Sequence, residues 1–168
     1  FRPMLDEGSF DAGELALMTF LQARCYGRPF VMLPFPVSGR FQHHCIGYNA
    51  DGGEMEPRDI EGRSVGLRTW SQTTSVWTKG ILQHEYGVDL DKVTWLTLAD
   101  AHLHEHRDPP NCRRLPAGTK LDQMLIAGEI PVAILGSQLP KLPNIRPLIP
   151  DPAAAAAAWY RREGVVPI

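Results

Sequence analysis

Strand-like and helix-like segments alternate along the chain, and this alternation constrains the fold more than any other sequence feature. Residues 63–67 (RSVGL), 92–98 (KVTWLTL) and 129–136 (EIPVAILG) are short apolar or β-branched runs, which predict buried strands. This order is typical of an α/β fold with a mixed, mostly parallel sheet. Helices are predicted at residues 10–27, 73–87, 119–128 and 151–164, and further extended segments at 30–37, 43–49 and 145–150.

The predicted helices begin and end at residues that commonly cap helices. Asp11 and Glu14, three residues apart, form a capping pair for the first helix. Thr119 and Asp122 repeat this pattern at the third helix, and Asp151 precedes a proline at the start of the last. A glycine closes each helix, as is usual at a helix C-terminus.

Composition and charge exclude some classes of partner. The 168 residues, 43% of them hydrophobic, suffice for one domain or two small lobes. With 17 Lys+Arg against 19 Asp+Glu, the formal net charge of -2 creates no field that attracts nucleic acid or an anionic membrane. No apolar run approaches the roughly 18 residues of a membrane-spanning helix. The three cysteines lack a CxxC spacing and favour a reducing compartment, so we expect a cytoplasmic protein.

The turn after the strand at 63–67 is rich in hydrogen-bond donors. Its stretch GLRTWSQTTSVW lies where that strand ends and the next helix begins. Ligands of open α/β sheets bind beyond the carboxyl ends of strands, and a helix N-terminus favours an anion. An arginine can also bind a carboxylate with two parallel hydrogen bonds. The turn therefore predicts an anion site; the alternative is ordinary capping by one hydroxyl, with the arginine on the surface.

The long polar loop at 99–118 contains the stretch HLHEH. Its histidines, His102, His104 and His106, alternate, so an extended chain would present all three on one face. Three imidazoles can bind zinc or iron. The surrounding sequence is that of a solvated loop, so we predict no metal here and keep the histidine trio as the alternative.

Several segments together resemble a known family. They are FRPMLDEGSFDAGELAL, GRFQHHCIGYN, ILQHEYGVDLDKVTW, DAHLHEHRDPPN, KLDQMLIAGEI and LIPDPAAAAAAWYRREGVVPI. They are similar to parts of the 4,5-dihydroxyphthalate decarboxylase-like proteins, which share the two-lobed fold of type II periplasmic solute-binding proteins. The resemblance implies that residues 1–50 are part of a first lobe, that residues 51–144 form a second lobe, and that residues 145–168 cross back to the first. Family members are longer at both ends, so the chain is expected to be partial.

The resemblance also implies an activity, that of a carboxy-lyase for hydroxylated aromatic carboxylates such as 4,5-dihydroxyphthalate. The reaction protonates the ring and releases CO2 in a cleft between the lobes, and it requires no organic cofactor. A histidine would donate the proton. The candidates are His102, which Glu105 would orient, and His43 and His44, which lie at the first crossing between the lobes.

The substrate would be held by residues of the turn and its surroundings. The expected carboxylate anchor is Arg68, Ser71, Thr73 and Thr74, with Arg40 as a second cation. Trp70 would stack on the aromatic ring. Glu14 is either a residue of the cleft or only the capping partner of the first helix.

Another class of function remains open with the same fold. The chain could instead be the solute-binding component of an ABC-type uptake system for small organic anions, in which case it would be periplasmic. A third reading is an enzyme of this fold that acts on another small acid. In each case the expected partner is a small organic anion, and a homo-oligomer is left open.

Overall fold

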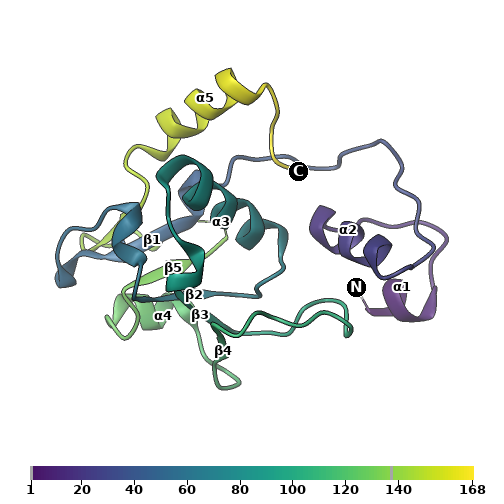
Figure 1. The fold of residues 1–168 in the computed structure, drawn as a ribbon, viewed down its shortest axis with the longest axis horizontal. Coiled ribbons are helices and arrows are strands. Elements are labelled where there is room, and N and C mark those ends of the chain that lie inside the picture. Colours follow the sequence, from purple (N-terminus) through teal and green to yellow (C-terminus); the bar gives the residue numbers. More distant parts are fainter. Residues whose placement is uncertain (1, 137) are drawn as a thin grey trace.

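The computed structural model describes residues 2–136 and 138–168, and within them the chain forms one sheet with helices on both faces (Figure 1). The sheet has the strand order β4-β3-β2-β5-β1-β6. Its strands are β1 (Ile46–Asn49), β2 (Ser64–Leu67), β3 (Thr94–Thr97), β4 (Cys112–Arg114), β5 (Val132–Ile134) and β6 (Ile145–Pro147). The helices are α1 (Arg2–Glu7), α2 (Leu17–Cys25), α3 (Thr73–Tyr86), α4 (Leu121–Ile126) and α5 (Pro152–Glu163).

The sheet is mixed and mostly parallel, as predicted. β4, β3, β2 and β5 run parallel to one another, whereas β1 pairs antiparallel with both β5 and β6. β1 and β6 include the residues expected at the two crossings, and Tyr48 pairs with Arg146 between them. The α/β class is therefore confirmed, while the two-lobed arrangement goes beyond what this single sheet shows.

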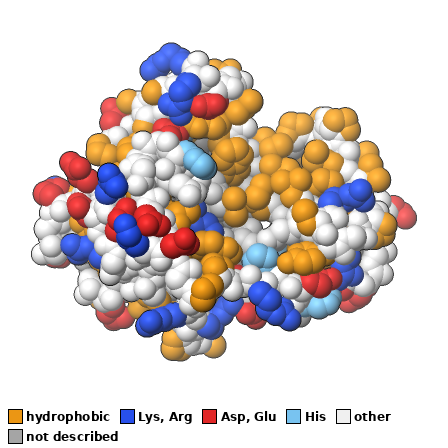
Figure 2. Space-filling view, in the orientation of Figure 1, with side chains coloured by type: hydrophobic (Ala, Val, Ile, Leu, Met, Phe, Trp, Pro, Cys, Tyr) orange, Lys and Arg blue, Asp and Glu red, His pale blue; other side chains and the backbone are white. Residues whose placement is uncertain are grey.

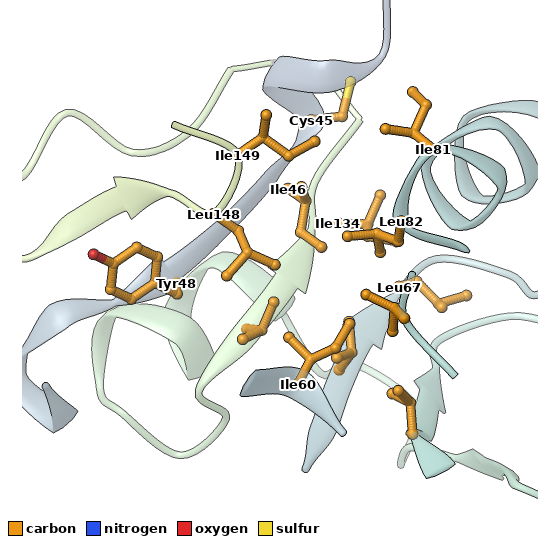
Figure 3. Close-up of a cluster of buried hydrophobic side chains, with 14 of the residues drawn as sticks. Cys45, Ile46, Tyr48, Ile60, Leu67, Ile81, Leu82, Ile134, Leu148 and Ile149 are labelled. Carbon is orange, nitrogen blue, oxygen red and sulfur yellow. The ribbon is translucent and has the colours of Figure 1, made fainter. Parts of the chain in front are cut away.

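The main hydrophobic core lies between the sheet and α3. Val65 and Leu67 on β2 point to this face and are fully buried, as are Ile46 on β1 and Leu82 on α3 (Figure 3). A second cluster on the opposite face includes Leu121 and Leu125 of α4.

Gly66, between Val65 and Leu67, faces the second cluster. A Cβ atom at this position would lie only 2.6 Å from Leu121 Cδ2 and 2.7 Å from Ile130 Cδ1. The glycine therefore allows α4 and its following turn to pack directly on the backbone of β2.

The N-terminal part of the chain lies beside the sheet. Figure 1 shows α1 and α2 to one side of it, and a small separate cluster joins Leu5, Ala23 and Leu103. The segment after α2 leaves large apolar side chains in solvent, with Val31 85% and Phe35 78% exposed. Figure 2 shows hydrophobic side chains gathered over this part of the molecule.

The first predicted helix is shorter than expected. α2 begins at Leu17, and Ala16 is its N-cap, without a side-chain capping bond. Asp11 and Glu14 lie in the exposed segment that precedes it, so the predicted capping pair is wrong. Gly13 accounts for part of the difference, because glycine disfavours helix and a Cβ there would collide with the Met4 side chain.

The start of α4 also differs from the prediction. Its N-cap is Lys120, without a side-chain capping bond. Thr119 Oγ1 instead donates to the Pro116 carbonyl over 2.7 Å, so a local turn takes the hydroxyl that was expected to cap the helix. Asp151, in contrast, caps α5 as predicted and accepts the Ala154 N–H at 3.0 Å.

One helix and one strand were not predicted from the sequence, and one predicted extended segment does not form a strand. α1 and β4 were not predicted, and β4 forms inside the polar loop by pairing with β3. The extended segment expected at 30–37 is irregular. No helix in the described part of the chain combines the length and the apolar character needed to cross a membrane.

Candidate functional site

The turn between β2 and α3 exposes a helix N-terminus at the edge of the sheet. Gln72 is the N-cap residue, in extended conformation and without a side-chain capping bond. The first bond within the helix runs from Val76 N–H to the Gln72 carbonyl, over 2.9 Å. The N–H groups of residues 73–75 therefore have no acceptor inside the helix, and the helix dipole is positive here.

A pocket of about 200 Å³ opens at this helix end. Its volume lies below the roughly 300–1,000 Å³ of sites for drug-sized ligands, which suits a small acid. Three of the predicted anchor residues, Arg40, Arg68 and Thr74, line it. The remaining lining residues are Gln72 and Ser75 from the turn and helix, and Ile134, Leu135 and Gly136 from the end of β5.

Two guanidinium groups make this pocket electropositive. Arg68, which follows β2, is exposed. Arg40 Nη2 donates to the Gly136 carbonyl and lies 3.5 Å from Thr74 Oγ1. The pocket therefore combines two fixed positive charges with a helix N-terminus, and this combination favours a carboxylate.

The N-terminus of α2 lies next to the N-terminus of α3. Met18 N–H, in the first turn of α2, donates to Thr73 Oγ1 over 3.3 Å. The Thr73 hydroxyl thus joins the N-terminal ends of α2 and α3 instead of pointing freely at a ligand. Thr19, the next residue of α2, contacts His102 in the long loop.

His102 lies beside this junction, although it is not among the residues that line the pocket. Its Nδ1 atom is 2.7 Å from Thr19 Oγ1, and Thr19 is buried. Burial lowers the pKa of His102, and the positive charge of Arg68 lowers it further. The imidazole is therefore mainly neutral at pH 7 in the free protein, and an anion bound at Arg68 would make its protonation easier.

The other predicted histidines lie elsewhere. His43 is buried, with its Nε2 atom 3.8 Å from Glu85 Oε1, and burial lowers the pKa of its imidazole. Glu85 lies near the C-terminal end of α3, and His43 is not among the residues that line the pocket. His44 lies next to Cys45, whose carbonyl accepts the N–H of pocket residue Leu135, but it does not line the pocket.

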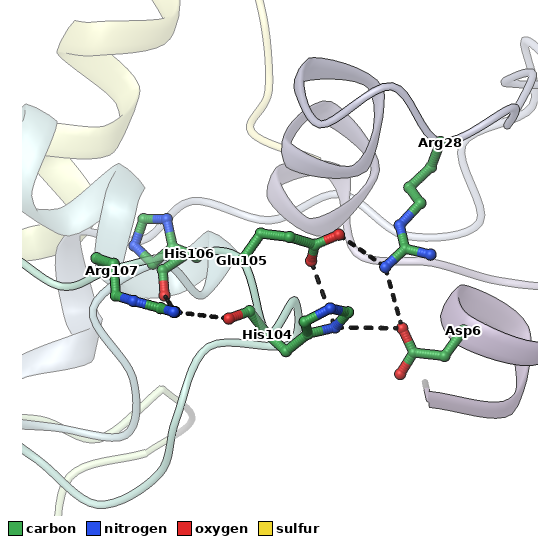
Figure 4. A network of polar contacts seen from close by, with 6 residues as sticks. All are labelled: Asp6, Arg28, His104, Glu105, His106 and Arg107. Atoms are coloured by element: carbon green, nitrogen blue, oxygen red, sulfur yellow. Dashed lines mark hydrogen bonds and ion pairs between the residues drawn. The ribbon is translucent and has the colours of Figure 1, made fainter.

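Glu105 has different partners from the one predicted. Its carboxylate accepts a hydrogen bond from Arg28 Nη2 at 2.7 Å and lies 3.5 Å from His104 Nδ1 (Figure 4). Arg28 also pairs with Asp6 on α1. This network ties the N-terminal helices to the long loop, so Glu105 has a structural role here, and Thr19 makes the contact with the His102 ring.

Three of the other expected ligand residues do not line the pocket. Ser71 is buried. The Trp70 ring packs edge-to-face on Trp95, with centroids 5.6 Å apart, and Lys79 Nζ lies 2.8 Å from the Trp70 ring centroid. Trp70 therefore belongs to the core, and stacking on a ligand is not what this geometry supports. Glu14 is exposed in the segment before α2.

The side chains of the three histidines do not point to a common position. His104 pairs with Asp6 and His106 with Asp108, whereas His102 is directed to α2. In the described part of the chain, no group of three or more His, Cys, Asp or Glu side chains is placed to hold a metal ion. The turn at 102–105 breaks the extended conformation that the metal alternative required.

The sequence reading missed Thr19, Gln72 and Lys79. Thr19 carries no local signal, because only the packing of α2 brings it to the site, whereas Gln72 lies within the predicted turn and is the N-cap of α3. Lys79 does carry one: it lies between Ser75 and Leu82 at helical spacing on the buried side of α3, where a charged residue is unusual.

Together, the fold and the pocket define an α/β protein with an electropositive pocket at the carboxyl edge of a mostly parallel sheet. No family model matches the chain. Over 178 aligned positions it is 27% identical to the 4,5-dihydroxyphthalate decarboxylase of Comamonas testosteroni. This match covers 95% of this chain and 52% of that protein. It is also 27% identical over 167 residues to the 4,5-dihydroxyphthalate decarboxylase of Pseudomonas putida, covering 90% of this chain and 64% of that protein.

These similarities confirm the resemblance noted from the sequence segments. They extend over nearly the whole chain, which spans between about half and about two thirds of the length of these relatives. The pocket with Arg40 and Arg68 lies within the region of similarity.

Proposed function

We propose that the protein is a carboxy-lyase acting on hydroxylated aromatic carboxylates such as 4,5-dihydroxyphthalate. One observation carries the proposal: the pocket at the N-terminus of α3 places Arg40 and Arg68 together, in a chain similar to two decarboxylases with that substrate in their names. The α/β fold alone is compatible with many functions, so the chemistry has to come from the site.

The pocket residues would hold a carboxylate of the substrate. Arg68 and Arg40 supply two guanidinium groups, and the unpaired N–H groups at the start of α3 supply further donors. An anchored carboxylate fixes the orientation of the ring, so that the carbon losing CO2 meets the proton donor.

His102 is the proton donor in this proposal. A hydroxyl para to the leaving carboxylate pushes electrons into the ring, and the carbon bearing the carboxylate accepts a proton. The carbon–carbon bond then breaks, its electron pair restores the aromatic ring, and CO2 departs. Because the pKa of His102 is lowered in the free protein, the negative charge of the bound substrate is needed to raise its protonated fraction.

The test is a turnover assay with matched variants. The purified protein is incubated with 4,5-dihydroxyphthalate, and CO2 and protocatechuate are measured. Arg68→Ala should reduce turnover strongly, whereas Arg63→Ala, at an exposed position before β2, should leave it unchanged. Tight binding without any product would reject the lyase and favour the solute-binding alternative.

A further inference from the structure

Lys79 is a buried lysine directly beneath the turn that carries Arg68. It lies in the second turn of α3, and only 5% of its surface is exposed. Lysine is rarely buried this far unless its ammonium group has a partner. Here Nζ donates to the Trp70 carbonyl over 2.8 Å and lies 2.8 Å from the centroid of the Trp70 ring.

The partners of this ammonium group are rigid. Trp70 packs on Trp95, which is fully buried on β3, and Lys79 Nζ lies 5.9 Å from the Trp95 ring centroid. The titratable groups facing Lys79 are Cys112 on β4 and Asp108 in the long loop, and their negative forms favour the ammonium form; burial raises the pKa of the Cys112 thiol to about 11, so this thiol is neutral at pH 7. Lys79 therefore lies between the turn at 68–72 and the buried Trp95 of β3.

The turn is fixed at three points. At its start, the Arg68 carbonyl accepts the N–H groups of Leu98 and Ala99, at 3.0 and 2.9 Å. At its end, the Gln72 carbonyl accepts the first helical bond. Lys79 holds the middle, through both the carbonyl and the ring of Trp70.

We propose that Lys79 is a positioning residue, which fixes the 68–72 turn so that Arg68 and the first turn of α3 face the pocket. The part of this inference that concerns ligand affinity rests on the proposed function of the pocket. The tether itself is a property of the fold and can be measured without any ligand.

The tether is sensitive to pH in the neutral range. Burial lowers the pKa of Lys79 to about 7, although Cys112 and Asp108 act in the opposite direction. A neutral amine keeps the hydrogen bond to the Trp70 carbonyl. Opening of the turn would expose Nζ to water, where a lysine keeps its proton up to about pH 10.5, so the opened state binds more protons and the turn should be held more firmly at pH 8 than at pH 6.

Hydrogen exchange and ligand binding together test the proposal. The wild-type protein is compared with Lys79→Met, which keeps the chain length without the charge, and with Lys92→Met, which removes an exposed lysine. At pH 8, we expect backbone amides of residues 69–72 to exchange about tenfold faster in Lys79→Met only, with about tenfold weaker binding of phthalate, because this variant lacks the hydrogen bond to the Trp70 carbonyl.

Each outcome of this experiment tests a separate part of the proposal. Unchanged exchange in a folded Lys79→Met variant would overturn the tether. Faster exchange with unchanged phthalate affinity would overturn the positioning role. If the wild-type protein does not bind phthalate but the turn still loosens in the variant, the tether stands and the proposed function fails.

A measurement on the wild-type protein covers the case in which Lys79→Met does not fold. After correction for intrinsic exchange, protection of residues 69–72 should rise between pH 6 and pH 8, because the opened turn binds a proton on Lys79 that the closed turn loses. Equal protection of the turn at both pH values would reject the proposal.

Discussion

Replacing Lys79 with methionine should change the pH dependence of stability in a defined direction. The side chain is 5% exposed, and burial lowers its pKa from 10.5 to about 7. Methionine has a similar length, so the substitution removes the charge and the amine while keeping most of the packing. Its effect on unfolding should therefore report the titration of one buried group.

The sign follows from proton binding. Between pH 7 and 10.5, the unfolded chain keeps a proton on Lys79 that the folded chain has lost, so wild-type stability rises with pH in this range. One proton corresponds to about 1.4 kcal/mol per pH unit. From pH 7 to pH 9 the wild-type protein should therefore gain about 3 kcal/mol relative to Lys79→Met, in which this group is absent.

Urea unfolding at pH 6 and pH 9, followed by far-ultraviolet circular dichroism, measures this difference. Lys79→Met should be relatively more stable at pH 6, where the wild-type protein must bury a charge, and the advantage should shrink or reverse at pH 9. Lys92→Met is the control, because Lys92 is exposed and its pKa is raised. A difference between wild type and Lys79→Met that stays within about 1 kcal/mol across this range would refute the reasoning.

Four further substitutions test the site and the core. Arg68→Ala should weaken phthalate binding about 10- to 100-fold in calorimetry and leave catechol binding unchanged, because it removes a charged hydrogen-bond donor; equal losses for both would remove Arg68 from the anchor role. His102→Gln should reduce kcat about 100-fold or more with less than about threefold change in substrate affinity, and an unchanged kcat would reject it as the proton donor. Gly66→Ala should destabilise the fold by about 1–3 kcal/mol in urea unfolding, because its Cβ would meet Leu121. Gly80→Ala, where the added methyl meets open space within α3, should stabilise by up to about 1 kcal/mol, and similar effects at both glycines would contradict this account of packing.

The path from β2 through the turn to α3 was predictable from local sequence. A short apolar run, a cluster of donors and a helix closed by Gly87 are separate signals, and each acts over a few residues. α3 runs from Thr73 to Tyr86, with Gly87 in the left-handed conformation at its end, as expected. Arg68 and Thr74 from this path line the pocket, and their roles in binding stay predictions.

The errors occurred where distant parts of the chain compete with a local preference. Asp11 and Glu14 match a capping pattern, but the helix begins later at Leu17. Trp70 lies among polar residues in the sequence and was expected to contact the ligand. In the structure its ring packs against Lys79 and Trp95 in the core. Such contacts leave no periodic or spacing signal in the turn itself.

The sequence by itself determined the α/β class, the helix with its N-terminus at the sheet edge, and the residue types that favour an anion there. These depend on short-range preferences: strand and helix periodicity, helix-ending glycines and the dipole of an uncapped helix. Only the tertiary structure decided that Arg40 joins Arg68, that Thr19 rather than Glu105 contacts His102, and that a lysine holds the turn. The physical reason is that these contacts join residues far apart in the chain, and close packing of the sheet and helices fixes them only once the whole domain has folded.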